Sequence, residues 1–62
     1  MNSDEKGLVE TYELRAELAE LKERVGDKQT AAALYEEASN EAMAAKKMKK
    51  ATELSLKASE LI

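Results

Sequence analysis

The sequence contains no cysteine, histidine, proline, tryptophan or phenylalanine, and only two glycines in 62 residues. Without cysteine or histidine it has no disulfide to stabilise a small core and no usual ligands for a structural zinc ion. The same absences remove the commonest general base and the most reactive nucleophile of enzymes. No glycine-rich phosphate loop is present. We therefore expect a non-enzymatic chain with no catalytic residues, no metal site and no cofactor.

Charge and hydropathy exclude two further classes of partner. The formal net charge is −3 and the isoelectric point is near 4.9, whereas nucleic-acid-binding proteins present a basic face to the phosphates. No apolar run approaches the length that spans a bilayer, and no signal peptide is recognisable. We expect a cytoplasmic protein with no nucleic-acid partner and no membrane partner.

The residues that are present favour helices along the whole chain. Alanine, glutamate, lysine and leucine are abundant, and all four are strong helix formers. We expect an all-α fold: a disordered N-terminal segment over 1–6, then a single domain over 7–62. Its helices are expected over about 8–25, 28–46 and 49–61.

A short turn at Gly26 and Asp27 organises this fold. Gly26 can adopt the left-handed conformation that ends a helix, and Asp27 can accept hydrogen bonds from the first turn of the next. Helices joined by so short a turn lie antiparallel, which predicts a helical hairpin. Its structural residues are Gly26, Asp27, Ala31, Leu34, Tyr35 and Ala38.

The first helix carries two apolar stripes. One stripe is Leu14, Leu18, Leu21 and Val25, and the other is Leu8, Tyr12, Ala16 and Ala19. A helix in a simple hairpin needs one apolar face. We therefore expect this helix to contact two neighbours.

Neither glycine nor proline interrupts residues 28–62, so the chain there could form one bent helix or two separate ones. At 100° per residue, the later apolar residues lie opposite the stripe that runs from Ala31 to Ala45. These later residues are Met48, Ala51, Leu54, Ala58 and Leu61. The phase change predicts a turn or bend within 46–50 and a third, C-terminal helix.

Residues that the expected core does not need are the candidates for binding a protein partner. They are Lys46, Lys47, Lys49, Lys50, Leu54, Leu56, Leu61 and Ile62. The lysines have an alternative interpretation as solvated residues that compensate the dipole at a helix C-terminus.

Residues 11–43 resemble a tetratricopeptide-type (TPR) or Sel1-like helical repeat. The matching residues are Leu18, Ala19, Gly26, Asp27, Ala31, Leu34, Tyr35 and Ala38. Arg15 and Lys22 stand where that repeat usually has aromatic residues, and its terminal proline is missing. The resemblance implies a helix-turn-helix unit of the kind that stacks on neighbours.

Residues 34–62 resemble the C-terminal helices of the eukaryotic elongation factor 2 kinases. The matching residues are Leu34, Tyr35, Ala38, Ala42, Met43, Lys47, Ala51, Lys57, Ala58 and Glu60. In that family this module recruits elongation factor 2 to a distant alpha-type serine/threonine kinase domain, a transferase that regulates translation. The resemblance implies a monomeric, non-catalytic substrate-docking domain whose partner is elongation factor 2 or the parent kinase domain. The turn at Gly26 is much shorter than in that family, and the last helix lacks its aromatics.

Two other hypotheses remain open from the sequence. The first helix, with its two stripes, could self-associate into a helical bundle. Alternatively, the domain could be a trafficking adaptor that holds a partner helix between its own helices. A stable oligomer in sedimentation would favour the bundle, and binding of amphipathic peptides would favour the adaptor.

Overall fold

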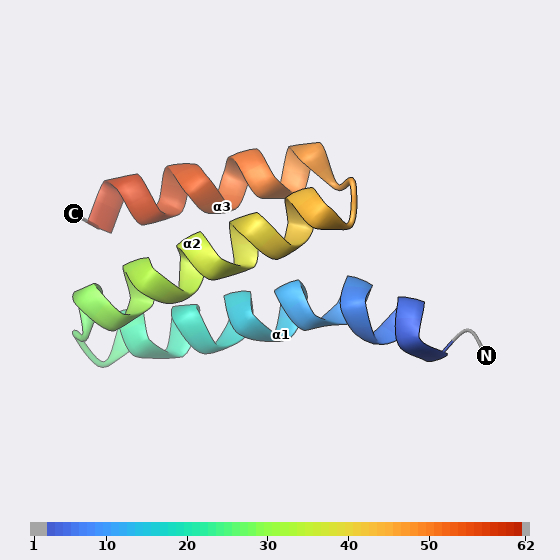
Figure 1. Cartoon of the computed structure of the whole chain (residues 1–62). Coiled ribbons are helices and arrows are strands. Elements are labelled where there is room, and N and C mark those ends of the chain that lie inside the picture. Colours follow the sequence, from blue (N-terminus) through green and yellow to red (C-terminus); the bar gives the residue numbers. More distant parts are fainter. Residues whose placement is uncertain (1–2, 62) are drawn as a thin grey trace.

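A computed structural model describes the backbone of residues 3–61 and the side chains of residues 11–61. It contains three α-helices, α1 (Ser3–Arg24), α2 (Lys28–Ala44) and α3 (Met48–Leu61), and no strand among the described residues. Each helix runs antiparallel to the one before it, and α2 lies between α1 and α3 (Figure 1). The fold is therefore the expected all-α hairpin plus a third helix.

The first helix begins earlier than expected. α1 starts at Ser3, so most of the segment 1–6 that we expected to be disordered is helical, and Met1 and Asn2 lie outside the described residues. This segment contains no proline and has two acidic residues, a composition that favours the first turn of a helix. The expected end near Val25 differs from the observed end at Arg24 by one residue.

The first turn has the predicted chemistry. Gly26 has a φ of +91°, and its N–H donates to the Glu23 carbonyl at 3.0 Å. The N–H of Asp27 donates to the Lys22 carbonyl at 2.8 Å, which completes a Schellman motif. The Asp27 carboxylate accepts from the Thr30 N–H at 3.3 Å and so caps α2.

The second turn repeats this motif without a glycine. Lys46 takes the left-handed position with a φ of +64°, and its N–H donates to the Met43 carbonyl at 2.9 Å. The N–H of Lys47 donates to the Ala42 carbonyl at 2.8 Å. The break predicted within 46–50 is therefore a full turn, and α2 and α3 are separate helices.

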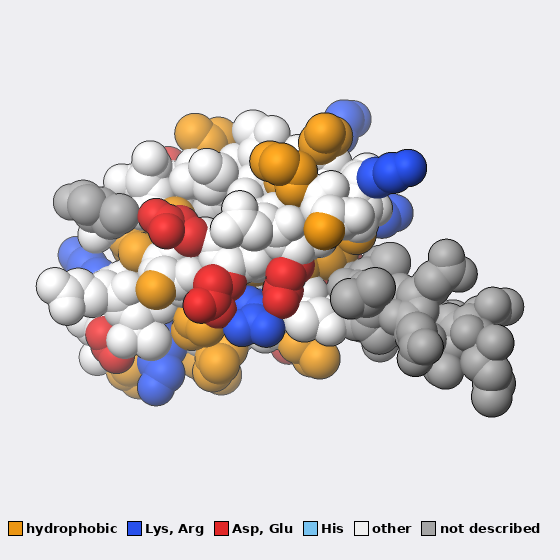
Figure 2. All heavy atoms as spheres, in the orientation of Figure 1, with side chains coloured by type: hydrophobic (Ala, Val, Ile, Leu, Met, Phe, Trp, Pro, Cys, Tyr) orange, Lys and Arg blue, Asp and Glu red, His pale blue; other side chains and the backbone are white. Residues whose placement is uncertain are grey.

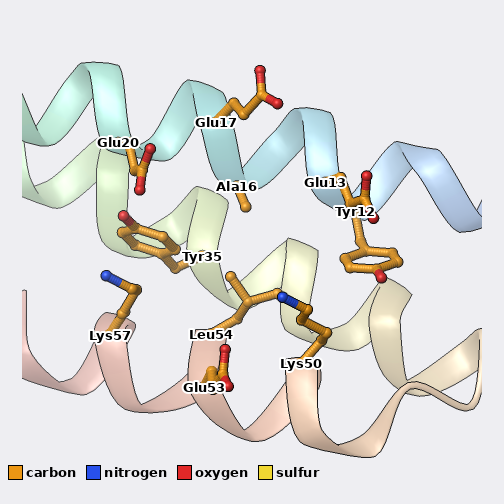
Figure 3. Close-up of a pocket in the computed structure, with 10 residues that line it drawn as sticks. All are labelled: Tyr12, Glu13, Ala16, Glu17, Glu20, Tyr35, Lys50, Glu53, Leu54 and Lys57. Atoms are coloured by element: carbon orange, nitrogen blue, oxygen red, sulfur yellow. The ribbon is translucent and has the colours of Figure 1, made fainter.

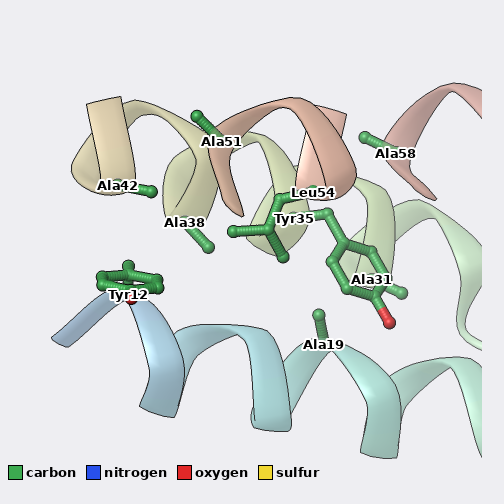
Figure 4. Close-up of a cluster of buried hydrophobic side chains, with 9 residues drawn as sticks. All are labelled: Tyr12, Ala19, Ala31, Tyr35, Ala38, Ala42, Ala51, Leu54 and Ala58. Atoms are coloured by element: carbon green, nitrogen blue, oxygen red, sulfur yellow. The ribbon is translucent and has the colours of Figure 1, made fainter. Parts of the chain in front are cut away.

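The core lies along both sides of α2 and consists mostly of alanine (Figure 4). Its buried residues are Tyr12, Ala19, Ala31, Tyr35, Ala38, Ala42, Ala51, Leu54 and Ala58. Alanine lets helix backbones approach closely, and the two tyrosine rings and Leu54 supply most of the side-chain volume. The predicted core positions Ala31, Tyr35 and Ala38 are confirmed, and Leu34 packs partly buried against the cluster.

Polar contacts join α2 to each neighbouring helix. The Arg15 Nε and Nη2 bind the two oxygens of Glu41 at 2.9 Å each, and its Nη1 binds Glu37 at 2.7 Å. On the other side, the buried Ser39 hydroxyl donates to the Ala51 carbonyl at 2.8 Å. Arg15 therefore joins α1 to α2 by charge-assisted hydrogen bonds.

Candidate interaction surfaces

The outer face of α1 exposes a row of large apolar side chains, which we call the α1 stripe. The exposed fractions are 64% for Leu14, 44% for Leu18, 55% for Leu21 and 77% for Val25. The opposite face of α1, with Tyr12, Ala16 and Ala19, packs into the core.

The expected second neighbour of α1 is not found within the described chain. α1 packs against α2 and makes only marginal contact with α3, because α3 occupies the far side of α2 (Figure 1). The α1 stripe is therefore left without a covering helix in the described part of the chain.

The α1 stripe has flanks of opposite charge. At 100° per residue, Glu13, Glu17 and Glu20 lie along one side of it, with Arg24 at the C-terminal end of the same side. Arg15 and Lys22 lie along the other side. Arg15 is paired with Glu37 and Glu41 on α2. Lys22 is the other basic residue of this flank, and it has no hydrogen bond or ion pair among the described residues.

A groove of about 300 Å³ lies between α1 and α3, over α2 (Figure 3). Its floor is apolar and its walls are charged. The lining residues are Tyr12, Ala16, Tyr35 and Leu54 on the floor, Glu13, Glu17 and Glu20 from α1, and Lys50, Glu53 and Lys57 from α3. Because Tyr12, Tyr35 and Leu54 are already buried, the groove offers a partner little apolar surface.

Tyr35 lies at one end of this groove. Its hydroxyl donates to a Glu23 carboxylate oxygen at 3.2 Å, and the Lys57 ammonium lies 5.8 Å from the centre of its ring. Burial, together with the bond to Glu23, raises the pKa of Tyr35 to about 12. The phenol is therefore neutral, and it acts as a hydrogen-bond donor.

The predicted lysine cluster is exposed around the turn from α2 to α3. Figure 2 shows basic side chains gathered at this end of the molecule beside apolar ones. Lys46 and Lys47 follow the C-terminus of α2, where cations are favourable. Lys49 and Lys50 fall in the first turn of α3, where the helix dipole disfavours them. Dipole compensation therefore accounts for only two of the four lysines.

The predicted apolar part of that surface does not form one patch. Leu54 is buried in the core, because the face of α3 with Ala51 and Ala58 packs against α2. Leu61 is partly buried against the same cluster, Leu56 is 58% exposed, and Ile62 lies outside the described residues. The candidate binding residues are thus divided between core and surface.

The α1 stripe is not among the partner-binding residues predicted from the sequence. Its members are spaced by four, three and four residues, which is the spacing of a coiled-coil interface. The two stripes of this helix predicted either a second neighbour or self-association into a bundle.

The described residues contain no group of three or more His, Cys, Asp or Glu side chains placed to hold a metal ion. None of the described helices is both long enough and apolar enough to cross a membrane. Comparison with protein-family models, with curated proteins and with solved structures finds no match to this chain. The resemblances to TPR or Sel1-like repeats and to elongation factor 2 kinases therefore remain predictions.

Proposed function

We propose that this chain is a non-catalytic helical module that binds another protein through the α1 stripe. The observation that supports this proposal is the exposure of Leu14, Leu18, Leu21 and Val25 on one face of one helix. Isolated exposed leucines are ordinary, but a contiguous apolar row on so small a domain is typical of an interaction site.

The expected binding is driven by burial of this row against an apolar face of the partner. Covering a half-exposed leucine contributes on the order of 1 kcal/mol, so the α1 stripe supplies a few kcal/mol in total. Because association costs several kcal/mol in lost freedom, the module is expected to bind weakly. Such a weakly binding module would be most effective when it is tethered to another protein domain.

In a more specific form of the proposal, the chain is a cytoplasmic substrate-docking domain that recruits elongation factor 2 for an alpha-type kinase. The support for this form is the sequence resemblance of residues 34–62. Tethering would raise the effective concentration of the substrate near a catalytic domain. Under this form the exposed Lys46, Lys47 and Leu56 supply a second contact, separate from the α1 stripe.

The test is an amide NMR titration of the dilute chain with purified elongation factor 2. The expected result is selective shifting or broadening over residues 14–25, and its loss in the double variant Leu18→Glu, Leu21→Glu. The matched control is Met43→Glu on α2, an apolar side chain of similar exposure that belongs neither to the α1 stripe nor to the second contact.

Two outcomes would contradict parts of the proposal. An amide spectrum that does not change when elongation factor 2 is added would exclude that factor as the partner. Shifts that persist in the double glutamate variant would remove the α1 stripe as the binding surface.

A further inference from the structure

We infer that the occupant of the α1 stripe is a second copy of this chain, bound in parallel across a two-fold axis. This inference rests on the proposed function, because it names the partner of the same surface. Three features of α1 support it: the spacing of the apolar row, the charge of its flanks and the position of α2.

The spacing of the row matches a two-stranded coiled coil. With intervals of four, three and four residues, Leu14 and Leu21 occupy d positions, and Leu18 and Val25 occupy a positions. Leucine at d with a β-branched residue at a favours two parallel strands, and of the two a positions Val25 meets this preference whereas Leu18 does not. In a parallel pair each of these residues contacts its own counterpart in the second copy.

The flanking charges select the parallel orientation. A parallel pair places the acidic flank of one copy against the basic flank of the other, and Glu17 then lies opposite Lys22, five residues further along the second copy. Neither side chain has a hydrogen bond or ion pair among the described residues. An antiparallel pair would also bring Glu17 near Arg24, but it would place the basic Arg15 and Lys22 of the two copies side by side.

The position of α2 leaves room for the second copy. α2 covers the face of α1 opposite the α1 stripe (Figure 1), so two α1 helices can approach without α2 or α3 between them. In the dimer, α1 would pack between its own α2 and the α1 of the second copy. α2 is already packed in this way, between α1 and α3. The contact involves only about three helical turns, below the size of a standard interface. The expected state is therefore a weak monomer–dimer equilibrium.

Cysteine cross-linking tests the orientation, because the native chain has no cysteine. In the parallel pair, the two copies of Leu14→Cys face each other and should form a disulfide under mild oxidation. In the antiparallel pair Leu14 lies opposite Val25, so the two cysteines would be about 16 Å apart, too far for a disulfide. Leu56→Cys, at a similarly exposed leucine on α3, is the matched control.

Sedimentation across concentration tests the association itself. The native chain should form dimers at high concentration, and Leu18→Glu should weaken the dimer by roughly tenfold or more, because it buries an unpaired charge. Far-UV circular dichroism should stay unchanged, since Leu18 lies outside the core. Glu17→Lys should weaken the dimer, and adding Lys22→Glu should restore it by exchanging the two charges.

Each of three contrary results would overturn a different part of the inference. A native chain that stays monomeric at every concentration overturns the inference but not the proposed function, which predicts that the α1 stripe binds a protein other than a second copy of this chain. If Leu18→Glu abolishes association but Leu14→Cys cross-links no faster than Leu56→Cys, the parallel arrangement is overturned. If Lys22→Glu fails to rescue Glu17→Lys, the inferred ion pair is overturned.

Discussion

At the residue scale, Tyr35 joins the core to the polar surface. Its ring is nearly fully buried between the helices, while its hydroxyl reaches Glu23 at the end of α1. The sequence predicted Tyr35 as a structural residue of the hairpin, and Tyr35 belongs to the core cluster. Its bond to Glu23 was not predictable, because it depends on how α1 and α2 pack.

Tyr35 should make the protein sensitive to alkaline pH. An unfolded tyrosine has a pKa near 10, and burial raises the folded pKa of Tyr35 to about 12. The folded state therefore retains a proton that the unfolded state loses, and the stabilisation is complete below about pH 10 and lost as pH rises towards 12. The free energy of unfolding should fall by about 2–3 kcal/mol over that window.

Urea unfolding at pH 8 to 12 would measure this loss, with Tyr35→Phe as the control. The phenylalanine variant keeps the ring but has no ionisable hydroxyl, so its decline over the same window should be clearly smaller. Equal declines in both proteins would show that other groups cause the alkaline unfolding.

At the element scale, the two turns are the same structure formed by different residues. Gly26 and Lys46 both have positive φ, and their motifs lie twenty positions apart. The apolar residues that follow them repeat at the same offset, as Ala31 with Ala51 and Leu34 with Leu54. The second turn has no glycine, so only the phase of the apolar residues predicted it; this internal repeat is an additional signal for it.

Opposite substitutions at the two turns should have opposite effects on stability. Gly26→Ala should lower the free energy of unfolding by about 1 kcal/mol, because a side chain disfavours positive φ. No atom lies within 4 Å of the added Cβ, so the cost comes from the backbone conformation. Lys46→Gly should raise the free energy of unfolding by roughly 0.5–1 kcal/mol, because glycine adopts positive φ without the steric cost of a side chain.

Chemical denaturation of the two variants and the native chain would measure both effects. Ala45→Gly is the control, because Ala45 has an ordinary φ of −85° and glycine there should only destabilise. A Lys46→Gly variant that is less stable than the native chain would contradict this explanation of the second turn.

At the scale of the whole molecule, α2 is the only one of the three described helices that packs on two sides, so each outer helix depends on it. α3 covers one side of α2 with Ala51, Leu54 and Ala58, and it satisfies the buried Ser39 hydroxyl. A chain that ends at Ala45 should lose its cooperative thermal transition and more helicity than the deleted residues account for, because two short helices are marginal alone.

Circular dichroism during heating would test this dependence. The control is full-length Leu56→Ala, whose exposed side chain lies outside the core, and which should keep a midpoint close to the native value. A truncated hairpin with a native-like midpoint would show that α1 and α2 form an independent unit.

The sequence by itself determined the three helices and their connectivity, because helix propensity, the cap at Asp27 and the apolar phase are local properties. It did not determine which stripe of α1 becomes the core, since both stripes have helical spacing. Tertiary packing decided this: the core face of α2 is rich in alanine and Tyr35 occupies much of its space. The α1 face with Ala16 and Ala19 can approach that surface closely. The larger Leu14, Leu18 and Leu21 remain outside, where they form the surface that we propose binds a partner.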